Sequence, residues 1–184
     1  KSITKNFPGI SIKLMEGDMI SISDYLKNGE VDLVFTYDTY LPDTQSFEPL
    51  FAAPPYALVP ISESNNAQNS TTLAALSRRP MIMLDLPYTR DYFLGLFKSR
   101  GLEPEVAHST RSAEIAQALV EGKFGYTILN IRPKNYSVDN TRYKALPISD
   151  TSVVPTFGMA TIRNVRQPKY VRSFIRGCIA LRDA

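Results

Sequence analysis

The sequence has little cysteine and no long apolar run. Cys178 is the one cysteine among 184 residues, so no disulfide can form within the chain. A single thiol is typical of a reducing compartment. No stretch of about 18 consecutive apolar residues occurs, and the N-terminus has no apolar signal-peptide region. We therefore expect a chain that neither crosses a membrane nor is exported, with a cytoplasmic location.

The residue patterns of catalytic and metal sites are also lacking. His108 is the one histidine, and no G-x-S-x-G, H-E-x-x-H or paired-cysteine spacing occurs. We therefore expect no metal ion, no cofactor and no enzymatic activity. The 21 Lys and Arg residues are scattered and nearly balanced by 18 Asp and Glu, which gives a net charge of +3. A nucleic-acid-binding surface needs a basic patch, so this chain is not expected to bind DNA by itself.

The most informative stretch, residues 86–133, has the pattern of two helix N-termini, with one strand between the helices and one after them. Thr89 and Arg90 begin the first helix, and Ser109, Thr110 and Ser112 precede the second. Hydroxyls and unpaired backbone N–H groups at helix starts favour a bound carboxylate or phosphate. Because Ser and Thr also cap helices where no ligand binds, a purely structural role stays open.

The first part of the chain has a strand-helix-strand pattern. Apolar residues alternate over residues 10–14, Asp18 is placed to cap a helix over residues 18–28, and residues 31–35 form a short apolar run. Such a run is typical of a parallel strand covered on both faces. We expect a right-handed βαβ unit here.

Two extended segments divide the rest of the chain. Residues 47–59 contain Pro54 and Pro55, which disfavour a helix, and residues 153–162 are extended again before a final amphipathic helix. Between them we expect a short helix at residues 73–76 and strands at residues 81–84, 105–108 and 126–130. A chain that leaves one α/β lobe, completes another and returns predicts lobe I at residues 1–56 and 156–184, and lobe II at residues 57–155. Ligands bind at such interfaces, near the carboxyl ends of strands.

Motifs along the whole chain resemble those of one known family. In order, they are FPGISIKLMEGD, LKNGEVDLVFTYD, FEPLFAAPPYALVP, GLEPEV, ALVEGKFGY and PTFGMATIR. Their order and spacing resemble the effector-binding domain of LysR-type transcriptional regulators, and the chain is also similar to bilobal periplasmic solute-binding proteins. The resemblance implies an α/β fold of two Rossmann-like lobes with a cleft between them, as in type 2 periplasmic binding proteins. The family's first strand of lobe I and its helix-turn-helix domain are not found in this sequence.

The resemblance implies that a small organic anion binds between the lobes. Carried over by position, the candidate ligand-binding residues are Asp18, Thr36, Tyr37, Tyr88, Thr89, Arg90, Ser109, Thr110, Arg111, Asn130 and Phe157. Arg90 and Arg111 could bind a carboxylate through two hydrogen bonds each. Tyr37 and Tyr88 could stack on an aromatic effector, although a half-buried tyrosine is more often part of a core.

The resemblance also implies partners. Helices at residues 18–28 and 111–121 carry surplus apolar residues, including Met19, Ile20 and Ala118, and such helices pair in a two-fold homodimer. The full-length protein would form a dimer or tetramer in the bacterial cytoplasm, and only it would contact DNA and RNA polymerase. Two alternatives stay open, a solute-binding protein of a transporter and an enzyme on a similar fold. A preceding helix-turn-helix in the gene product would indicate the regulator, and a signal peptide the transporter component.

Overall fold

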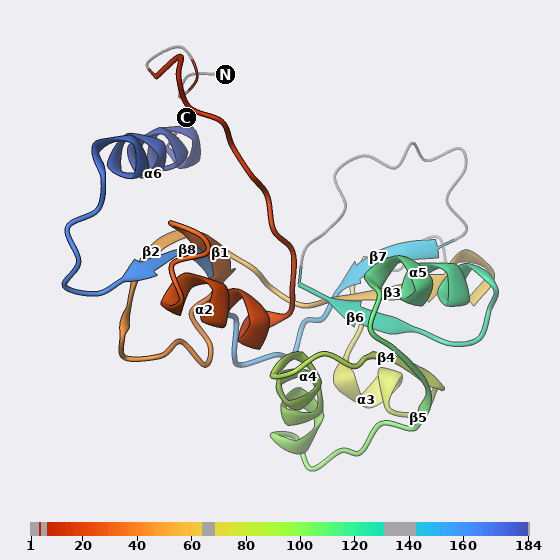
Figure 1. The fold of residues 1–184 in the computed structure, drawn as a ribbon. Coiled ribbons are helices and arrows are strands. Elements are labelled where there is room, and N and C mark those ends of the chain that lie inside the picture. The colour runs from red at the N-terminus through yellow and green to blue at the C-terminus, as the bar shows by residue number, and fades with distance from the viewer. Residues whose placement is uncertain (1–3, 5–6, 64–68, 131–142, 184) are drawn as a thin grey trace. The chain divides into compact units, whose positions relative to one another are not determined.

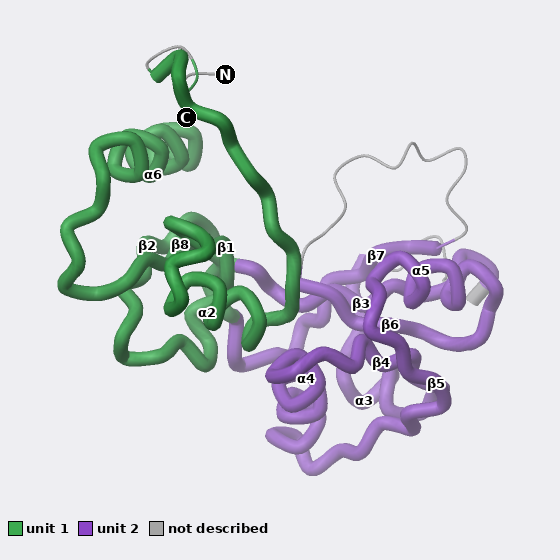
Figure 2. Tube along the Cα trace, in the orientation of Figure 1, with its two compact units in different colours: residues 1–52, 155–184 green, residues 53–154 purple. Residues whose placement is uncertain are grey.

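The computed structural model describes residues 4, 7–63, 69–130 and 143–183 (Figure 1). The chain divides into two compact units (Figure 2): unit 1 contains Lys1–Ala52 and Pro155–Ala184, and unit 2 contains Ala53–Val154. The assignment of regulatory lobes to residues 1–56 with 156–184 and to residues 57–155 stays a prediction. In the described part, no helix is long and apolar enough to cross a bilayer.

Unit 1 is built on a three-stranded antiparallel sheet with the order β1-β8-β2. The strands are β1 (Val34–Tyr37), β2 (Gln45–Ala52) and β8 (Thr156–Ile162), and the helices are α2 (Met19–Lys27) and α6 (Lys169–Arg182). As the sequence predicts, Asp18 caps α2, because its carboxylate accepts a hydrogen bond from the backbone N–H of Ser21 at 3.0 Å. The buried cluster described in this unit consists of Leu26, Val34 and Ala160.

Two expectations for unit 1 are wrong. Residues 10–14 form no strand, and the side chains of Ile12 and Leu14 are 56% and 86% exposed. Alternating apolar residues make a strand only when a neighbouring backbone completes the ladder, and the strands described in this sheet pair with one another. The strand expected at residues 31–35 begins instead at Val34, and β1 lies antiparallel to β8. The described residues therefore contain no parallel βαβ unit here.

Unit 2 contains two small sheets and three helices. β3 (Tyr56–Pro60) pairs antiparallel with β6 (Thr127–Leu129) and β7 (Tyr143–Pro147), whereas β4 (Met81–Leu84) pairs parallel with β5 (Val106–Thr110). The helices are α3 (Leu73–Leu76), α4 (Thr89–Lys98) and α5 (Ala113–Glu121), and η1 (Ile61–Glu63) is a single turn. The predicted helix at residues 73–76 and strand at residues 81–84 are confirmed. β7 has no counterpart among the strands predicted from the sequence.

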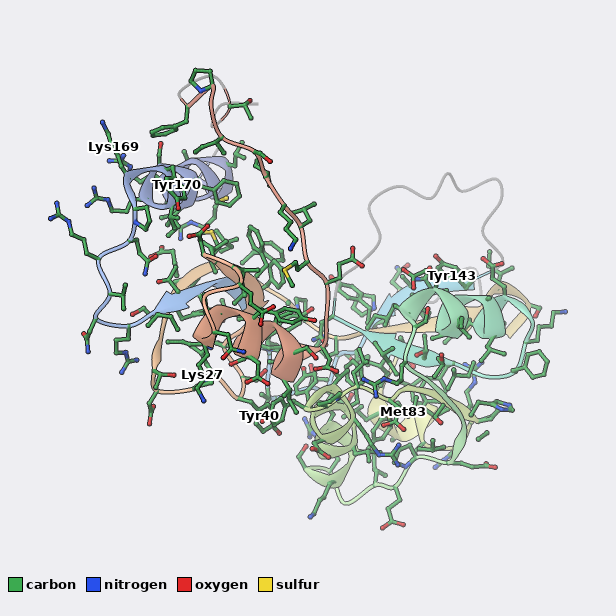
Figure 3. All side chains as sticks on the ribbon, in the orientation of Figure 1. Lys27, Tyr40, Met83, Tyr143, Lys169 and Tyr170 are labelled. Atoms are coloured by element: carbon green, nitrogen blue, oxygen red, sulfur yellow. The ribbon has the colours of Figure 1, made fainter. Side chains whose placement is uncertain are left out.

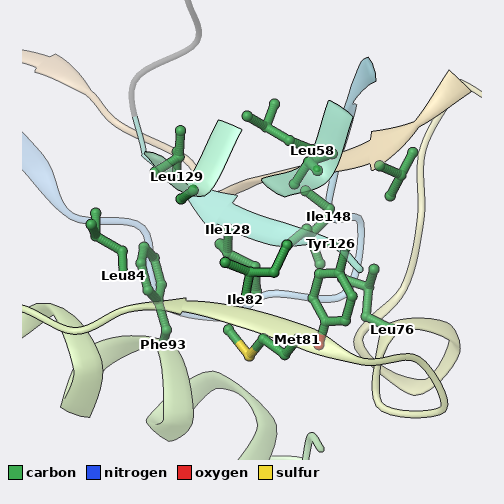
Figure 4. Close-up of a cluster of buried hydrophobic side chains, with 14 of the residues drawn as sticks. Leu58, Leu76, Met81, Ile82, Leu84, Phe93, Tyr126, Ile128, Leu129 and Ile148 are labelled. Carbon is green, nitrogen blue, oxygen red and sulfur yellow. The ribbon is translucent and has the colours of Figure 1, made fainter. Parts of the chain in front are cut away.

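The core of unit 2 forms around β4. All four β4 residues are buried, as a short, continuous apolar run predicts for a parallel strand covered on both faces (Figure 4). Phe93 and Phe97 of α4 and Val120 of α5 belong to the same buried cluster. The helical spacing of apolar residues in the sequence predicts a core-facing side with Phe93, Leu96 and Phe97 for α4, and all three are buried. In α5 the same spacing predicts Ile115, Ala116, Leu119 and Val120, of which Ala116 and Val120 are buried and Ile115 is 54% exposed.

A glycine fixes the junction between β4 and β6. Gly125 has a φ of 147°, and a Cβ atom at this position would collide with the carbonyl oxygen of Pro80. The next residue, Tyr126, donates its N–H to that same oxygen at 3.0 Å and accepts a hydrogen bond from the N–H of Ile82 at 2.7 Å. The close approach of the two backbones therefore requires glycine at position 125.

We predict that Gly125→Ala lowers the free energy of unfolding by about 2–4 kcal/mol, through backbone strain and displacement of the Pro80 carbonyl. The control is Gly95→Ala within α4, where an added Cβ meets no atom within 4 Å. That change should stabilise the protein by about 0.5–1 kcal/mol, because alanine is the better helix former. Urea denaturation measures both, and equal midpoints for the two variants would contradict the proposed backbone contact.

Candidate functional site

The carboxyl ends of β4 and β5 bring two helix starts together in unit 2. The strands are parallel and adjacent, with Leu84 in register with Thr110. One residue beyond β4, the N–H of Asp85 donates to the carbonyl oxygen of Thr110 at 2.8 Å. Because α4 follows β4 and α5 follows β5, this pairing places the segments that begin both helices at one edge.

A cavity of about 360 Å³ lies at this edge. It is lined by Asp85, Leu86, Pro87, Tyr88, Arg90, Asp91 and Arg111. The structure therefore brings together three of the residues predicted from sequence, namely Tyr88, Arg90 and Arg111. The other predicted residues from these segments, Thr89, Ser109 and Thr110, are not among those that line it.

The start of α4 has no side-chain cap. Its N-cap residue, Tyr88, has φ 63° and ψ −31°, and no side chain makes a capping hydrogen bond there. A bulky residue with positive φ is strained, and such strain is concentrated at ligand sites. The N–H of Arg90 in this first turn donates to the carbonyl oxygen of Leu86 at 3.1 Å, so the backbone donors are partly occupied. The positive end of the α4 dipole still lies at the cavity, where it favours an anion.

Backbone N–H groups at the start of α5 donate hydrogen bonds to side chains of the protein itself. The hydroxyl of Ser112 accepts the N–H of Ile115 at 3.3 Å and donates to the Glu114 carboxylate at 2.8 Å. The Ser112 hydrogen bond and a backbone hydrogen bond hold the pKa of Glu114 below its usual value. Ser112 also donates its own N–H to the hydroxyl of Thr110 at 3.2 Å. These contacts occupy donors that an anion would need at this end.

The cavity contains charges of both signs. Arg90 lies 3.2 Å from the Asp85 carboxylate, and the two side chains are 42% and 41% exposed. An exposed ion pair of this kind contributes about 0–1 kcal/mol, so a competing carboxylate can replace Asp85 at small cost. Arg111 adds a second cation and Asp91 a second carboxylate. Among the described residues, no group of three His, Cys, Asp or Glu side chains could hold a metal ion.

The side chains of Asn130 and Tyr92 donate hydrogen bonds to backbone near the first and last residues of unit 2. The Asn130 side-chain amide donates to the carbonyl oxygen of Ala53 at 2.7 Å. The Tyr92 hydroxyl donates to the carbonyl oxygen of Val153 at 3.1 Å. Asn130 also hydrogen-bonds Tyr92, whose pKa is raised mainly by burial. Asn130 was predicted as a ligand contact, and the structure shows this structural role. Tyr92 is not among the residues predicted from the sequence, where its one signal is its place about one helical turn after Thr89.

The remaining predicted site residues belong to unit 1. Asp18 is occupied as the cap of α2, and Thr36 is buried in β1 opposite Gly158. Tyr37, at the end of β1, makes an edge-to-face contact with Phe157, at 5.4 Å between ring centroids. These contacts give each of the four residues a structural role, and their contact with a ligand stays a prediction.

We predict that Ser112→Ala lowers the free energy of unfolding by about 1 kcal/mol, because the variant loses the cap of α5. Thr89→Val should change the free energy by less than about 0.5 kcal/mol, because Thr89 is the first helical residue and not the cap. Thermal denaturation compares the two variants. An equal loss in Thr89→Val would mean that its hydroxyl caps α4.

The chain is similar to solved regulator structures. It is 28% identical to HinK, a LysR family transcriptional regulator from Pseudomonas aeruginosa, with a TM-score of 0.86 over 97% of this chain and 63% of that one. The effector-binding domain of QuiR in complex with shikimate is 19% identical, with a TM-score of 0.83 over 99% of this chain and 87% of that one. The BenM effector-binding domain with benzoate is 19% identical, with a TM-score of 0.81 over 99% of this chain and 84% of that one.

The two effector-binding domains, at their low identity, show the fold alone. The chain spans about two thirds of the length of HinK. No curated protein matches the sequence. The LysR substrate binding domain matches residues 1–181. This match confirms the resemblance and, with the structural likeness, the type 2 periplasmic-binding-protein-like fold class. The chain belongs to the family of LysR substrate-binding domains.

Proposed function

We propose that this chain is the effector-sensing domain of a bacterial LysR-type transcriptional regulator, with a small organic carboxylate as effector. The carboxylate binds in the cavity at the start of α4. The observation that carries the proposal is the uncapped α4 start, where strained Tyr88 lies beside Arg90 and Arg111. Sensing, and not catalysis, is the role that this combination supports.

The chemistry of the cavity favours a carboxylate. A guanidinium presents two parallel N–H donors that match the two carboxylate oxygens, and the helix dipole adds to the attraction. The bound carboxylate replaces Asp85 on Arg90, so one exposed ion pair is exchanged for another. The ligands named for QuiR and BenM, shikimate and benzoate, are carboxylates. Contact of Tyr37 and Phe157 with an aromatic effector stays a prediction from the sequence.

We predict opposite effects for two substitutions in the cavity, with benzoate and shikimate as probes in calorimetry. Arg111→Met should weaken the binding of whichever carboxylate binds by about tenfold or more, the effect of losing a charge-assisted hydrogen bond. Asp85→Asn should strengthen it by about two- to fivefold, because Arg90 loses its competing partner.

Lys98→Met is the matched control, since it removes a positive charge at the opposite end of α4. It should leave affinity within about twofold, because exposed charges more than about 10 Å apart are screened by salt. Equal effects of Arg111→Met and Lys98→Met would show that only net charge matters. Weaker binding in Asp85→Asn would contradict the exchange of carboxylates on Arg90.

We also propose that the chain forms a homodimer and is part of a longer polypeptide. Ile20 on α2 and Ile115 on α5 are both exposed, although isoleucine is normally buried. We propose that two copies associate through these helices with two-fold symmetry. Effector binding then changes the spacing of two helix-turn-helix domains on DNA, and RNA polymerase is contacted by the full-length dimer or tetramer in the cytoplasm.

We predict that the 184-residue chain sediments as a dimer at about 50 µM, and that Ile20→Glu or Ile115→Glu makes it monomeric by burying an unpaired charge at the interface. Ile61→Glu is the control, because Ile61 is also exposed but lies in η1. This control should remain dimeric. If Ile61→Glu dissociates the dimer and the two helix variants do not, the interface lies elsewhere.

A further inference from the structure

Positive charge is concentrated in residues 156–182, which belong to unit 1. This range has six of the 21 Lys and Arg residues and no Asp or Glu, whereas the rest of the chain has 15 cations and 18 carboxylates. The sixth cation, Arg182, is ion-paired with Asp183 and Glu48. The other five are exposed and make no ion pair with the residues that the structure describes. We call them the cationic stripe: Arg163, Arg166, Lys169, Arg172 and Arg176.

The cationic stripe follows one face of α6. Lys169, Arg172 and Arg176 are three and four residues apart, so they lie within about 60° of one another around the helix. The opposite face is packed, because Val171 is 4% exposed and the ring of Phe174 contacts a ring of β1 edge-to-face. Figure 3 labels Lys169 at the start of α6, where its side chain points away from the sheet of unit 1. The packed face therefore holds α6 in place while its cations remain in water.

Hydrogen bonds fix the turn that carries the other two cations. The Gln167 side-chain amide donates to the carbonyl oxygens of Ile162 at 3.3 Å and Val165 at 3.2 Å. The backbone N–H of Arg163 donates to the carbonyl oxygen of the residue before β2 at 2.8 Å. Arg163 and Arg166 are therefore held directly before the start of α6, so the stripe continues from the helix into the turn.

The cations at the start of α6 do not stabilise the helix. Its first turn has no acidic residue, and Pro168 at the N-cap position makes no side-chain capping hydrogen bond. Positive side chains near a helix N-terminus are repelled by the helix dipole. Such an arrangement is expected where charges serve binding and not the stability of the element that carries them.

The density and kind of charge fit the backbone of duplex DNA. An α-helix rises 1.5 Å per residue, so the three cations from Lys169 to Arg176 cover about 10 Å. Duplex DNA has one phosphate per about 1.7 Å of its axis, which provides a negative charge for every cation of the stripe. Four of the five cations are arginines, whose guanidinium groups bind phosphate through two parallel N–H donors.

Other partners fit the stripe less well. A protein interface has an apolar centre, whereas the exposed large apolar residues between positions 163 and 176 are only Val165 and Tyr170. A helix on a membrane surface buries its apolar face in lipid, but Val171 on that face of α6 is buried in unit 1. Single-stranded nucleic acid stacks on free aromatic rings. Tyr170, also labelled in Figure 3, instead donates its hydroxyl to the Asp32 carboxylate at 3.3 Å.

We propose that the cationic stripe binds the phosphate backbone of double-stranded DNA, without reading its sequence, when the longer protein is bound to DNA. The inference rests on the proposed function, in which this chain is part of a DNA-binding regulator. Five cations neutralise at most five phosphates, which is too few for tight binding at physiological salt. The stripe therefore adds to the contacts of a DNA-binding domain. The expectation that the chain alone does not bind DNA then applies at physiological salt, and weak binding is expected at low salt.

The test is fluorescence anisotropy of a labelled 30-base-pair duplex of arbitrary sequence, titrated with the 184-residue chain at about 20–100 mM salt. For five phosphates, the logarithm of the binding constant should fall with the logarithm of the salt concentration with a slope of about −4.5. Lys169→Gln combined with Arg172→Gln should reduce this slope by about 2 and weaken binding at the lowest salt at least about tenfold. No binding at the lowest salt would overturn the proposal.

The matched control is Lys27→Gln combined with Arg78→Gln, which also removes one exposed lysine and one exposed arginine. It should change DNA binding less than about twofold, because these residues lie outside the stripe. Equal losses in the two double variants would overturn the proposal, since only net charge would then matter. Polyglutamate that displaces the duplex as effectively as unlabelled DNA of equal charge would also overturn it, by indicating an acidic protein as partner.

Two further measurements separate the possible causes of a loss. The stripe variant should unfold at the same or a higher temperature than the unsubstituted chain, because it removes cations that the α6 dipole repels. In the longer gene product it should weaken binding to specific and arbitrary DNA by the same factor, and an effect confined to one sequence would contradict backbone recognition. Carboxylate binding by the same variants reports on the cavity of unit 2, so a failure of the proposed function is detected separately.

Discussion

The burial of β4 is the constraint on which the proposed site depends. Its four apolar residues are covered on every side, and backbone hydrogen bonds from Ile82 to Tyr126 and from Asp85 to Thr110 fix its position. A strand held in this way ends at a defined point, and α4 must begin within a few residues. The strained backbone of Tyr88 accomplishes that turn. The cavity is therefore a consequence of core packing, because its charged residues follow the end of a buried apolar strand.

The groove of unit 1 and the cavity of unit 2 differ in what they can bind. The groove of unit 1, lined by residues 10–17 and 30–35, is the larger, but its lining is mostly apolar and contains one lysine against three carboxylates. The cavity of unit 2 is smaller and has two guanidinium groups and an uncapped helix start. Volume alone would favour the groove as the effector site, whereas charge and hydrogen-bonding chemistry favour the cavity. An anion in the groove would face three carboxylates and one lysine, whereas an anion in the cavity would face two guanidinium groups and two carboxylates.

Much of the fold could be predicted from the sequence where local pattern and packing agree. Asp18 as a cap, α3 and β4 are found at the positions their patterns predict. The strand expected at residues 10–14 failed because alternation records only which faces are apolar, whereas a ladder needs a partner. The candidate site was predictable in part. Helix-start chemistry identified Arg90 and Arg111, and a serine directly before a helix is a local capping signal that Ser112 fulfils. No local pattern could show that Asp85 pairs with Arg90.

The central claim is that the start of α4 receives the carboxylate. The most direct measurement is a titration of the ¹⁵N-labelled chain with benzoate or shikimate, followed by amide chemical shifts. We expect the largest saturable shifts at the amides of residues 88–91 and much smaller ones at residues 112–115, where Ser112 already occupies a donor. Largest shifts at residues 10–17 and 31–35 would contradict the account, because they would place the effector in the groove of unit 1.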